Sequence, residues 1–309
     1  MVVPQYFIQT NKITLQHYNR QNQHCMKRVI SSLFTLLLLS CLQYSYAQSA
    51  GDTIVLRDIQ WDRSSPAGME ELNIPSNGSL LQGFIYKANG HQAHPTLILL
   101  HGYPGNERNL DIAQVVRARG WNVIYFDYRG SWGSQGTFSF TNCVEDVVNV
   151  VAFCKQYADL FHIDTSNIAL FGHSMGGWVC LKALQKLPGI KKGFALSTWD
   201  IAGDVAANKN NFDSIKATMG NYFVLNASVQ QQYGPVIKNP AYFDLKNDGK
   251  ALANKQIIML DEHDRNAAIA EAIKKENKAY FDYNVWETDH PFTNKRIALI
   301  KKLWAFLNK

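Results

Sequence analysis

Short apolar segments alternate along the chain with segments whose apolar residues recur at helical spacing. Continuous apolar runs such as Thr96–Leu100 are typical of strands that are buried on both faces of a mostly parallel sheet. We predict strands at 54–61, 80–86, 96–100, 123–126, 168–171, 193–197, 255–260 and 280–286. We predict helices at 109–119, 142–157, 177–187, 266–277 and 293–307. This alternation predicts an α/β fold with a doubly wound, mostly parallel sheet and helices on both of its faces.

The segment from about 200 to 250 breaks the alternation. It is rich in Asn, Gln, Tyr and Lys, with helical patterns only at 212–219 and 228–233. We interpret it as an insertion between two strands of one domain that covers residues 48–309. Such insertions often act as lids over the carboxyl ends of the strands, where open α/β sheets place their active sites. The alternative is an irregular surface excursion.

Residues 1–47 have the pattern of a leader with a signal peptide. Lys27-Arg28 is followed by the mostly apolar run Val29–Leu42 and by the small residues of Ser45-Tyr46-Ala47. The run is shorter than the roughly 20 residues that span a bilayer, so we expect no stable membrane span. These features predict translation from Met26, export, and a mature chain that begins at Gln48. The alternative is a lipoprotein acylated at Cys41.

Charge and cysteine content exclude several classes of protein. The chain has 31 basic and 25 acidic residues, but four basic residues and no acidic ones lie in the leader, which leaves 27 against 25. No basic cluster suggests nucleic acid, and no His, Asp or Glu pattern has metal-ligand spacing, so we expect neither a metal nor a cofactor. We interpret three cysteines as small core residues and not as a disulfide framework: Cys143, Cys154 and Cys180.

The candidate nucleophile is Ser174. It lies in Gly172-His173-Ser174-Met175-Gly176, between the predicted strand 168–171 and the predicted helix 177–187. A serine on so sharp a strand-to-helix turn is exposed above the sheet, because the neighbouring glycines let other elements approach closely. This context predicts a catalytic serine rather than a turn serine.

A serine hydroxyl needs a base to take its proton, and the base needs an acid that orients it. His290, between the last predicted strand and helix, is the candidate base, and Asp264, after the strand that ends at Leu260, is the candidate acid. Other residues remain in competition for these roles: Asp200, Asp261 and Glu262 as acids, and His263 as base.

An acyl-transfer reaction also needs backbone donors where the oxyanion develops. The N–H of Met175, directly after the nucleophile, is one candidate. The N–H of Tyr103 is the other, in the turn Gly102–Asn106 that follows the predicted strand 96–100.

Four motifs resemble the α/β-hydrolase superfamily, in particular its serine aminopeptidase-like and prolyl-oligopeptidase-like branch. They are His101–Asn106, Phe126–Ser134, Gly172–Gly177 and Asp289–Phe292, and the resemblance runs from about Leu80 to the C-terminus. It implies the triad order serine, acid, histidine. It also implies that the glycine-rich loop 129–136 is structural. The chain departs from the family at Asp261, where members usually have glycine.

The resemblance implies a serine hydrolase that forms an acyl-enzyme, and leaves its substrate open because this fold hosts many reactions. We expect a secreted hydrolase of small carboxylic esters. A peptidase that trims short peptides would use the same residues and is the alternative. A non-catalytic binding protein on this fold is a more distant one, since it would not need all three residues.

Overall fold

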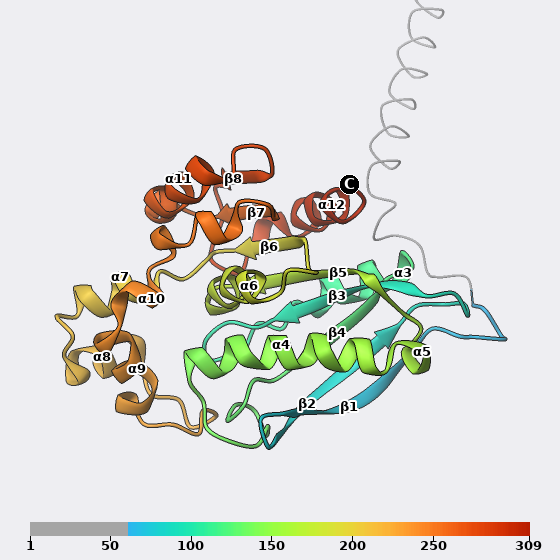
Figure 1. Cartoon of the computed structure of the whole chain (residues 1–309), viewed down its shortest axis with the longest axis horizontal. Coiled ribbons are helices and arrows are strands. Elements are labelled where there is room, and N and C mark those ends of the chain that lie inside the picture. The colour runs from blue at the N-terminus through green and yellow to red at the C-terminus, as the bar shows by residue number, and fades with distance from the viewer. Residues whose placement is uncertain (1–60) are drawn as a thin grey trace, which may run out of the picture. The chain divides into compact units, whose positions relative to one another are not determined.

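The strands of the sheet lie in the order β1-β2-β4-β3-β5-β6-β7-β8 in the computed structural model, which describes residues 61–309 (Figure 1). The pairings β1–β2 and β2–β4 are antiparallel, and the others are parallel. The strands are β1 Gly68–Ser76, β2 Ser79–Lys87, β3 His94–Leu100, β4 Asn122–Phe126, β5 Ile163–His173, β6 Lys192–Leu196, β7 Gln256–Asp261 and β8 Phe281–Val285. The predicted mostly parallel α/β sheet is confirmed.

The first strand of the sheet was not predicted. β1 alternates between buried and exposed side chains, with Leu72, Ile74 and Ser76 buried. Such alternation is typical of an antiparallel edge strand that covers the core with one face only, and it lacks the continuous apolar run on which the prediction relied. The predicted strand 54–61 and the predicted leader 1–47 lie outside the described residues, apart from Trp61.

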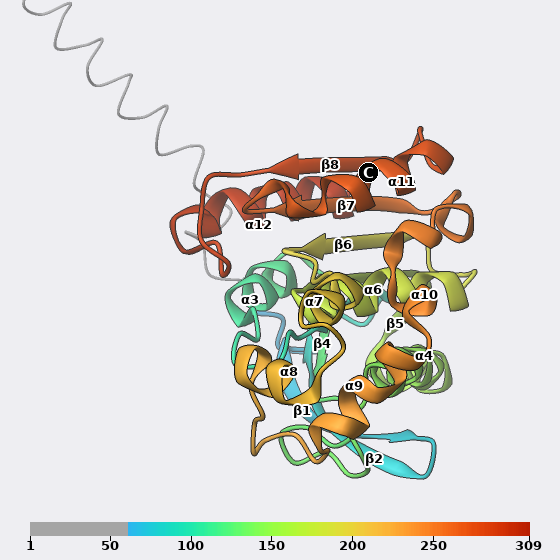
Figure 2. The same ribbon diagram turned by 90° about the vertical axis from the view of Figure 1, so that its left-hand side faces the viewer.

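Helices cover both faces of the sheet. Helices α3 (Leu110–Ala118) and α12 (Arg296–Leu307) lie on one face, and α4 (Phe140–Gln156), α6 (Met175–Lys186) and α11 (Ala267–Glu276) lie on the other (Figure 2). The short α5 (Ala158–Phe161) follows α4. No helix among residues 61–309 is both long and apolar enough to cross a membrane.

The insertion is helical and gathers at one end of the sheet (Figure 1). It contains four helices and two 3₁₀ turns: α7 Ile201–Ala207, α8 Phe212–Met219, α9 Val229–Lys238, α10 Pro240–Phe243, η1 Leu245–Asn247 and η2 Lys250–Leu252. The Nζ of Lys182 on α6 lies 3.0 Å from Oδ2 of Asp248, and this buried ion pair ties the insertion to the main domain. Main-chain hydrogen bonds tie it to the glycine-rich loop, from Trp132 N to Val224 O and from Asn226 N to Gly130 O.

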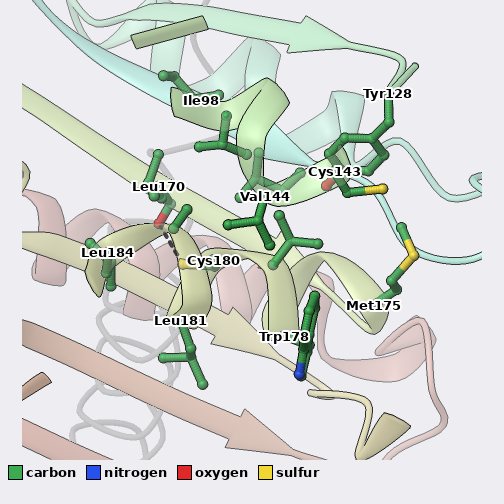
Figure 3. Packing of buried hydrophobic residues seen from close by; sticks show 14 of the residues in the cluster. Ile98, Tyr128, Cys143, Val144, Leu170, Met175, Trp178, Cys180, Leu181 and Leu184 are labelled. Atoms are coloured by element: carbon green, nitrogen blue, oxygen red, sulfur yellow. Dashed lines mark hydrogen bonds between the residues drawn. The ribbon is translucent and has the colours of Figure 1, made fainter. Parts of the chain in front are cut away.

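The core between α4, α6 and the sheet fixes the helix that follows the candidate nucleophile. Trp178, Leu181 and Leu184 of α6 are fully buried, in the same cluster as Val144 of α4 and Leu170 of β5 (Figure 3). Full burial of each such side chain contributes about 1.5–3 kcal/mol, so α6 is held firmly beneath the strand ends. The three cysteines at 143, 154 and 180 are free and buried, as expected of core residues.

The glycine-rich loop is anchored by a buried arginine. The Nε of Arg129 lies 2.5 Å from Oδ1 of Asp146, and its Nη2 lies 2.8 Å from Oε2 of Glu145, both on α4. Ser76 Oγ also donates to Asp146, at 2.6 Å. These contacts hold the loop in place and join β1, α4 and the loop in one hydrogen-bonded network, which fits the structural role expected of the loop.

Candidate active site

Ser174 lies in a sharp turn between β5 and α6 and has a strained backbone. Its φ is 59° and its ψ is −118°, a conformation that residues other than glycine rarely adopt. The flanking glycines are sterically required. A Cβ at Gly172 would collide with the carbonyl oxygen of Gly176, and a Cβ at Gly176 would collide with that of Leu100. The predicted turn geometry is therefore present.

Neighbouring strands hold this strained turn in place. Ser174 N donates to Leu196 O at 2.8 Å, and Ser174 O accepts from Trp199 N at 3.1 Å. Leu196 ends β6 and Trp199 lies just beyond it, so the serine is fixed at the carboxyl edge of the sheet. Surroundings that determine the backbone this fully are what allow a strained residue to persist.

The carboxyl edge of the sheet opens into a cavity of about 500 Å³ that contains Ser174. The structure thus brings Ser174 and His290, which are far apart in the sequence, to the same cavity. Its other walls come from loops at the strand ends and from the insertion: Tyr103, Ser197, Thr198, Trp199, Asp200, Gly203, Asp204, Met219, Tyr222, Glu262, His263, Arg265 and Asn266.

His290 pairs with Glu262. Its Nδ1 lies 2.8 Å from Oε1 of Glu262. An ionised carboxylate accepts hydrogen bonds only, so Nδ1 carries the proton and Nε2 is left free to accept one. Burial raises the pKa of Glu262, but hydrogen bonds from His290 and Ser197 outweigh it and lower the pKa to about 2. Glu262 is therefore a carboxylate at neutral pH.

The predicted pairing of Asp264 with His290 is not present in the structure. β7 continues one residue beyond its predicted end, to Asp261, which is fully buried. Glu262, the first residue after β7, reaches His290. The chain then turns into the 3₁₀ segment Asp264–Asn266, where Asp264 is exposed. Glu262 was predicted only as a competing acid, because the sequence does not mark where β7 ends.

The other competing acids have different partners. Asp261 Oδ1 accepts from Thr198 N at 3.1 Å, and its Oδ2 accepts from Asn266 Nδ2 at 3.1 Å. Burial raises the pKa of Asp261 to about 6. Asp200 caps α7 by accepting from Gly203 N at 3.0 Å. Both carboxylates thus support loops around the cavity.

The loop that follows β3 passes very close to the serine. A Cβ at Gly102 would lie 3.1 Å from the Cβ of Ser174, so only glycine lets the backbone approach without displacement. Tyr103 comes next, and its hydroxyl donates to Oε1 of Gln232 in the insertion at 2.8 Å. Met175 is the first residue of α6, so its N–H has no intrahelical partner. This placement suits the predicted role of both N–H groups as oxyanion donors.

Several of the remaining walls of the cavity are aromatic or acidic. Tyr103 packs against Trp199 and Tyr222, with ring centroids 5.6 and 5.3 Å away. Trp199 Nε1 donates to Oδ2 of Asp204 at 2.7 Å, which fixes the indole in the wall.

Within residues 61–309, no group of three or more His, Cys, Asp or Glu residues could hold a metal ion.

Comparison with known families and sequences gives one family and several relatives. The family described as serine aminopeptidase, S33, matches residues 91–248. The uncharacterized protein YfhR of Salmonella typhimurium is 28% identical over 170 residues, which cover 53% of this chain and 54% of YfhR. The lysophosphatidylserine lipase ABHD12 of Danio rerio is 27% identical over 105 residues, which cover 33% of this chain and 26% of that protein. The chain thus spans about half the length of YfhR and about a quarter of the length of ABHD12.

Solved structures share the fold at low sequence identity. An esterase of Pyrobaculum calidifontis has a TM-score of 0.60 and 14% identity, with 86% of this chain and 90% of the esterase covered. A candidate dipeptidyl aminopeptidase IV of Bacteroides ovatus has a TM-score of 0.58 and 16% identity, with 78% of this chain and 36% of that chain covered. At such identities these likenesses concern the fold alone.

Proposed function

Because this chain belongs to the serine aminopeptidase S33 family of hydrolases, within the α/β-hydrolase superfamily, we propose that it is a serine hydrolase with Ser174, His290 and Glu262 as its triad. The observation that carries the proposal is the strained Ser174 at the same cavity as a His290–Glu262 pair whose Nδ1–Oε1 distance is 2.8 Å. Glu262 replaces Asp264 as the proposed acid.

In this mechanism, Nε2 of His290 takes the proton of Ser174 as Oγ attacks the acyl carbon. The N–H groups of Tyr103 and Met175 stabilise the oxyanion. The tetrahedral intermediate collapses, His290 passes the proton to the departing oxygen or nitrogen, and an acyl-enzyme remains. Water, deprotonated by His290, then attacks the acyl carbon, and His290 returns the proton to Ser174 Oγ as that bond breaks and the acid leaves. Glu262 orients the imidazole and stabilises its charged form throughout.

We propose small carboxylic esters as the preferred substrates. An alkoxide leaves more readily than an amine, so a general Ser-His-acid site needs less assistance with esters. The cavity volume suits a small acyl group, and the aromatic rings of Tyr103, Trp199 and Tyr222 provide apolar walls. A peptidase that acts on short peptides is the second candidate, since the family description and the structural neighbour from B. ovatus both name peptidases.

Esters are expected to be turned over with a higher kcat/KM than amides of matched size, with acetyl and butyryl groups preferred over long acyl chains. The measurement is a series of p-nitrophenyl esters beside aminoacyl-p-nitroanilides, with the purified wild type and the Ser174→Ala variant as background. Higher kcat/KM on the anilides than on the acetyl and butyryl esters would favour the peptidase instead.

We also propose that the protein is exported and that its mature chain begins at Gln48. The support is the sequence pattern of residues 26–47, which lie outside the described part of the structure. Mass spectrometry of the protein recovered from the cell envelope and the medium is expected to give Gln48 as the N-terminus. Acylated Cys41 as the first residue would establish a lipoprotein, and a retained leader would exclude processing.

A further inference from the structure

Ser197 has an unusual backbone just beyond the end of β6. Its φ is 46°, in the left-handed region that favours glycine, and the residue is 3% exposed. A serine there costs conformational energy that a glycine would avoid. Strained residues of this kind cluster at functional sites, which suggests that the Ser197 side chain has a function.

The surrounding chain holds Ser197 in this conformation. Its own N–H donates to Leu260 O at 2.8 Å, which extends the pairing of β6 with β7. The next residue is held at both of its main-chain polar groups, because Thr198 N donates to Asp261 Oδ1 at 3.1 Å and Asn266 Nδ2 donates to Thr198 O at 2.6 Å. Three contacts from the β7 end therefore fix where the Ser197 side chain points.

That side chain points at the proposed acid. Ser197 Oγ lies 2.5 Å from Oε2 of Glu262 and 3.3 Å from the carbonyl oxygen of His290. A hydroxyl has one proton, and the shorter contact to a charged acceptor takes it. Glu262 thus has one carboxylate oxygen for Ser197 and the other for His290, whose Nδ1 lies 2.8 Å from Oε1.

We propose that Ser197 is a positioning residue of the catalytic acid: its hydroxyl fixes Oε2 of Glu262, and this keeps Oε1 directed at Nδ1 of His290. The inference rests on the proposed triad and extends it by a fourth residue that acts through Glu262. A glutamate has three rotatable side-chain bonds, so one contact at Oε1 would leave the carboxylate free to rotate. A second contact removes that freedom, as supporting hydrogen bonds do around metal-binding histidines.

Four other charged or titratable groups lie near the pair of Glu262 and His290 and contribute to its pH dependence. His263 Nε2 lies 3.4 Å from Oε1 of Glu262, and the ring of His173 lies 4.8 Å from that of His290. Asp261 adjoins Glu262 along the chain, and Arg296 donates to the carbonyl oxygen of Pro291 at 3.0 Å. The variants below leave all four of these groups unchanged.

The test compares Ser197→Ala, which removes the hydroxyl and keeps the strain, with Ser197→Gly, which removes both. We expect kcat to fall roughly ten- to hundredfold in both variants, since each loses a hydrogen bond to a charged group. We expect the Gly variant to melt at a higher temperature than the Ala variant, because glycine relieves the left-handed strain. Ser131→Ala is the matched control. It removes another buried hydroxyl, 2.8 Å from Tyr128 O, away from the cavity, and should keep the wild-type kcat.

The pH profile distinguishes positioning from a purely structural role. Without the Ser197 donor, the carboxylate of Glu262 can rotate away from Nδ1 of His290 and stabilises the imidazolium less. The acid limb of kcat/KM should therefore move to lower pH, by roughly half a unit, in both Ser197 variants. A profile that coincides with that of the wild type, whatever happens to kcat or the melting temperature, would overturn the proposal.

A fluorophosphonate probe separates failure of the inference from failure of the proposed function. Labelling of wild-type Ser174, together with slower labelling of the Ser197→Ala variant, supports both. Equal labelling rates in the two proteins would overturn the role of Ser197 and leave the triad intact. A wild type that is not labelled at Ser174 would overturn the triad and the inference with it.

Discussion

Replacing Ser174 by alanine is expected to lower kcat/KM by about 10⁴-fold or more while leaving the fold intact, because no other group in the cavity would take over as nucleophile. The substitution removes one oxygen atom and keeps the Cβ, so the strained turn and its flanking glycines stay as they are. The measurements are ester hydrolysis, circular dichroism and covalent labelling by a fluorophosphonate.

A matched control uses a serine away from the site. Ser166, exposed on β5, gives up only a hydrogen bond of 2.6 Å to Asp164 when replaced by alanine. The Ser166→Ala variant should keep wild-type activity and labelling. Equal labelling of the Ser174→Ala variant and the wild type would show that a different residue is the nucleophile.

Replacing Glu262 by glutamine is expected to lower kcat by about 10⁴-fold, whereas Asp264→Asn should change it by less than about threefold. The amide of glutamine has no charge to stabilise the imidazolium, and its NH₂ group favours the wrong tautomer of His290. Asp264 is exposed and makes no hydrogen bond to His290 among the described contacts. The measurement is kcat for both variants under saturating ester.

The two substitutions are matched, since each converts a carboxylate of the same loop into its amide. A large loss in Asp264→Asn with an active Glu262→Gln would restore the acid that its position after the predicted strand first suggested. It would also imply that the loop rearranges when substrate is bound.

The sheet could be predicted from the sequence wherever strands are buried on both faces. Continuous apolar runs mark β3, β4, β5, β6 and β7, and these were predicted to within a few residues except at the start of β5, which begins at Ile163. β1 was missed because an edge strand buries one face only. The insertion was located by its composition, but its four helices were only partly predicted, since short helices depend on packing more than on local periodicity.

The acid of the site was harder to predict, because it depends on the residue at which β7 ends. Ser174 and His290 follow from motifs with strong local constraints, and both line the cavity. The acid depends on where β7 ends, and one additional strand residue shifts the choice from Asp264 to Glu262. Strand ends are poorly marked in a sequence, because hydrogen bonding to neighbouring strands decides them. Ser197 had no sequence signal, since its role comes from backbone conformation.

Part of the cavity wall lies on a different stretch of chain from the proposed triad. Ser174, Glu262 and His290 lie on loops at the strand ends, whereas Met219 and Tyr222 belong to the insertion. Evolution can therefore exchange or remodel residues 201–252 and alter substrate range without disturbing the proposed triad. The buried ion pair of Lys182 with Asp248 limits which segments can replace residues 201–252. A transplanted segment must keep an acid at that point, because it would otherwise leave an unpaired buried lysine on the helix that follows the proposed nucleophile.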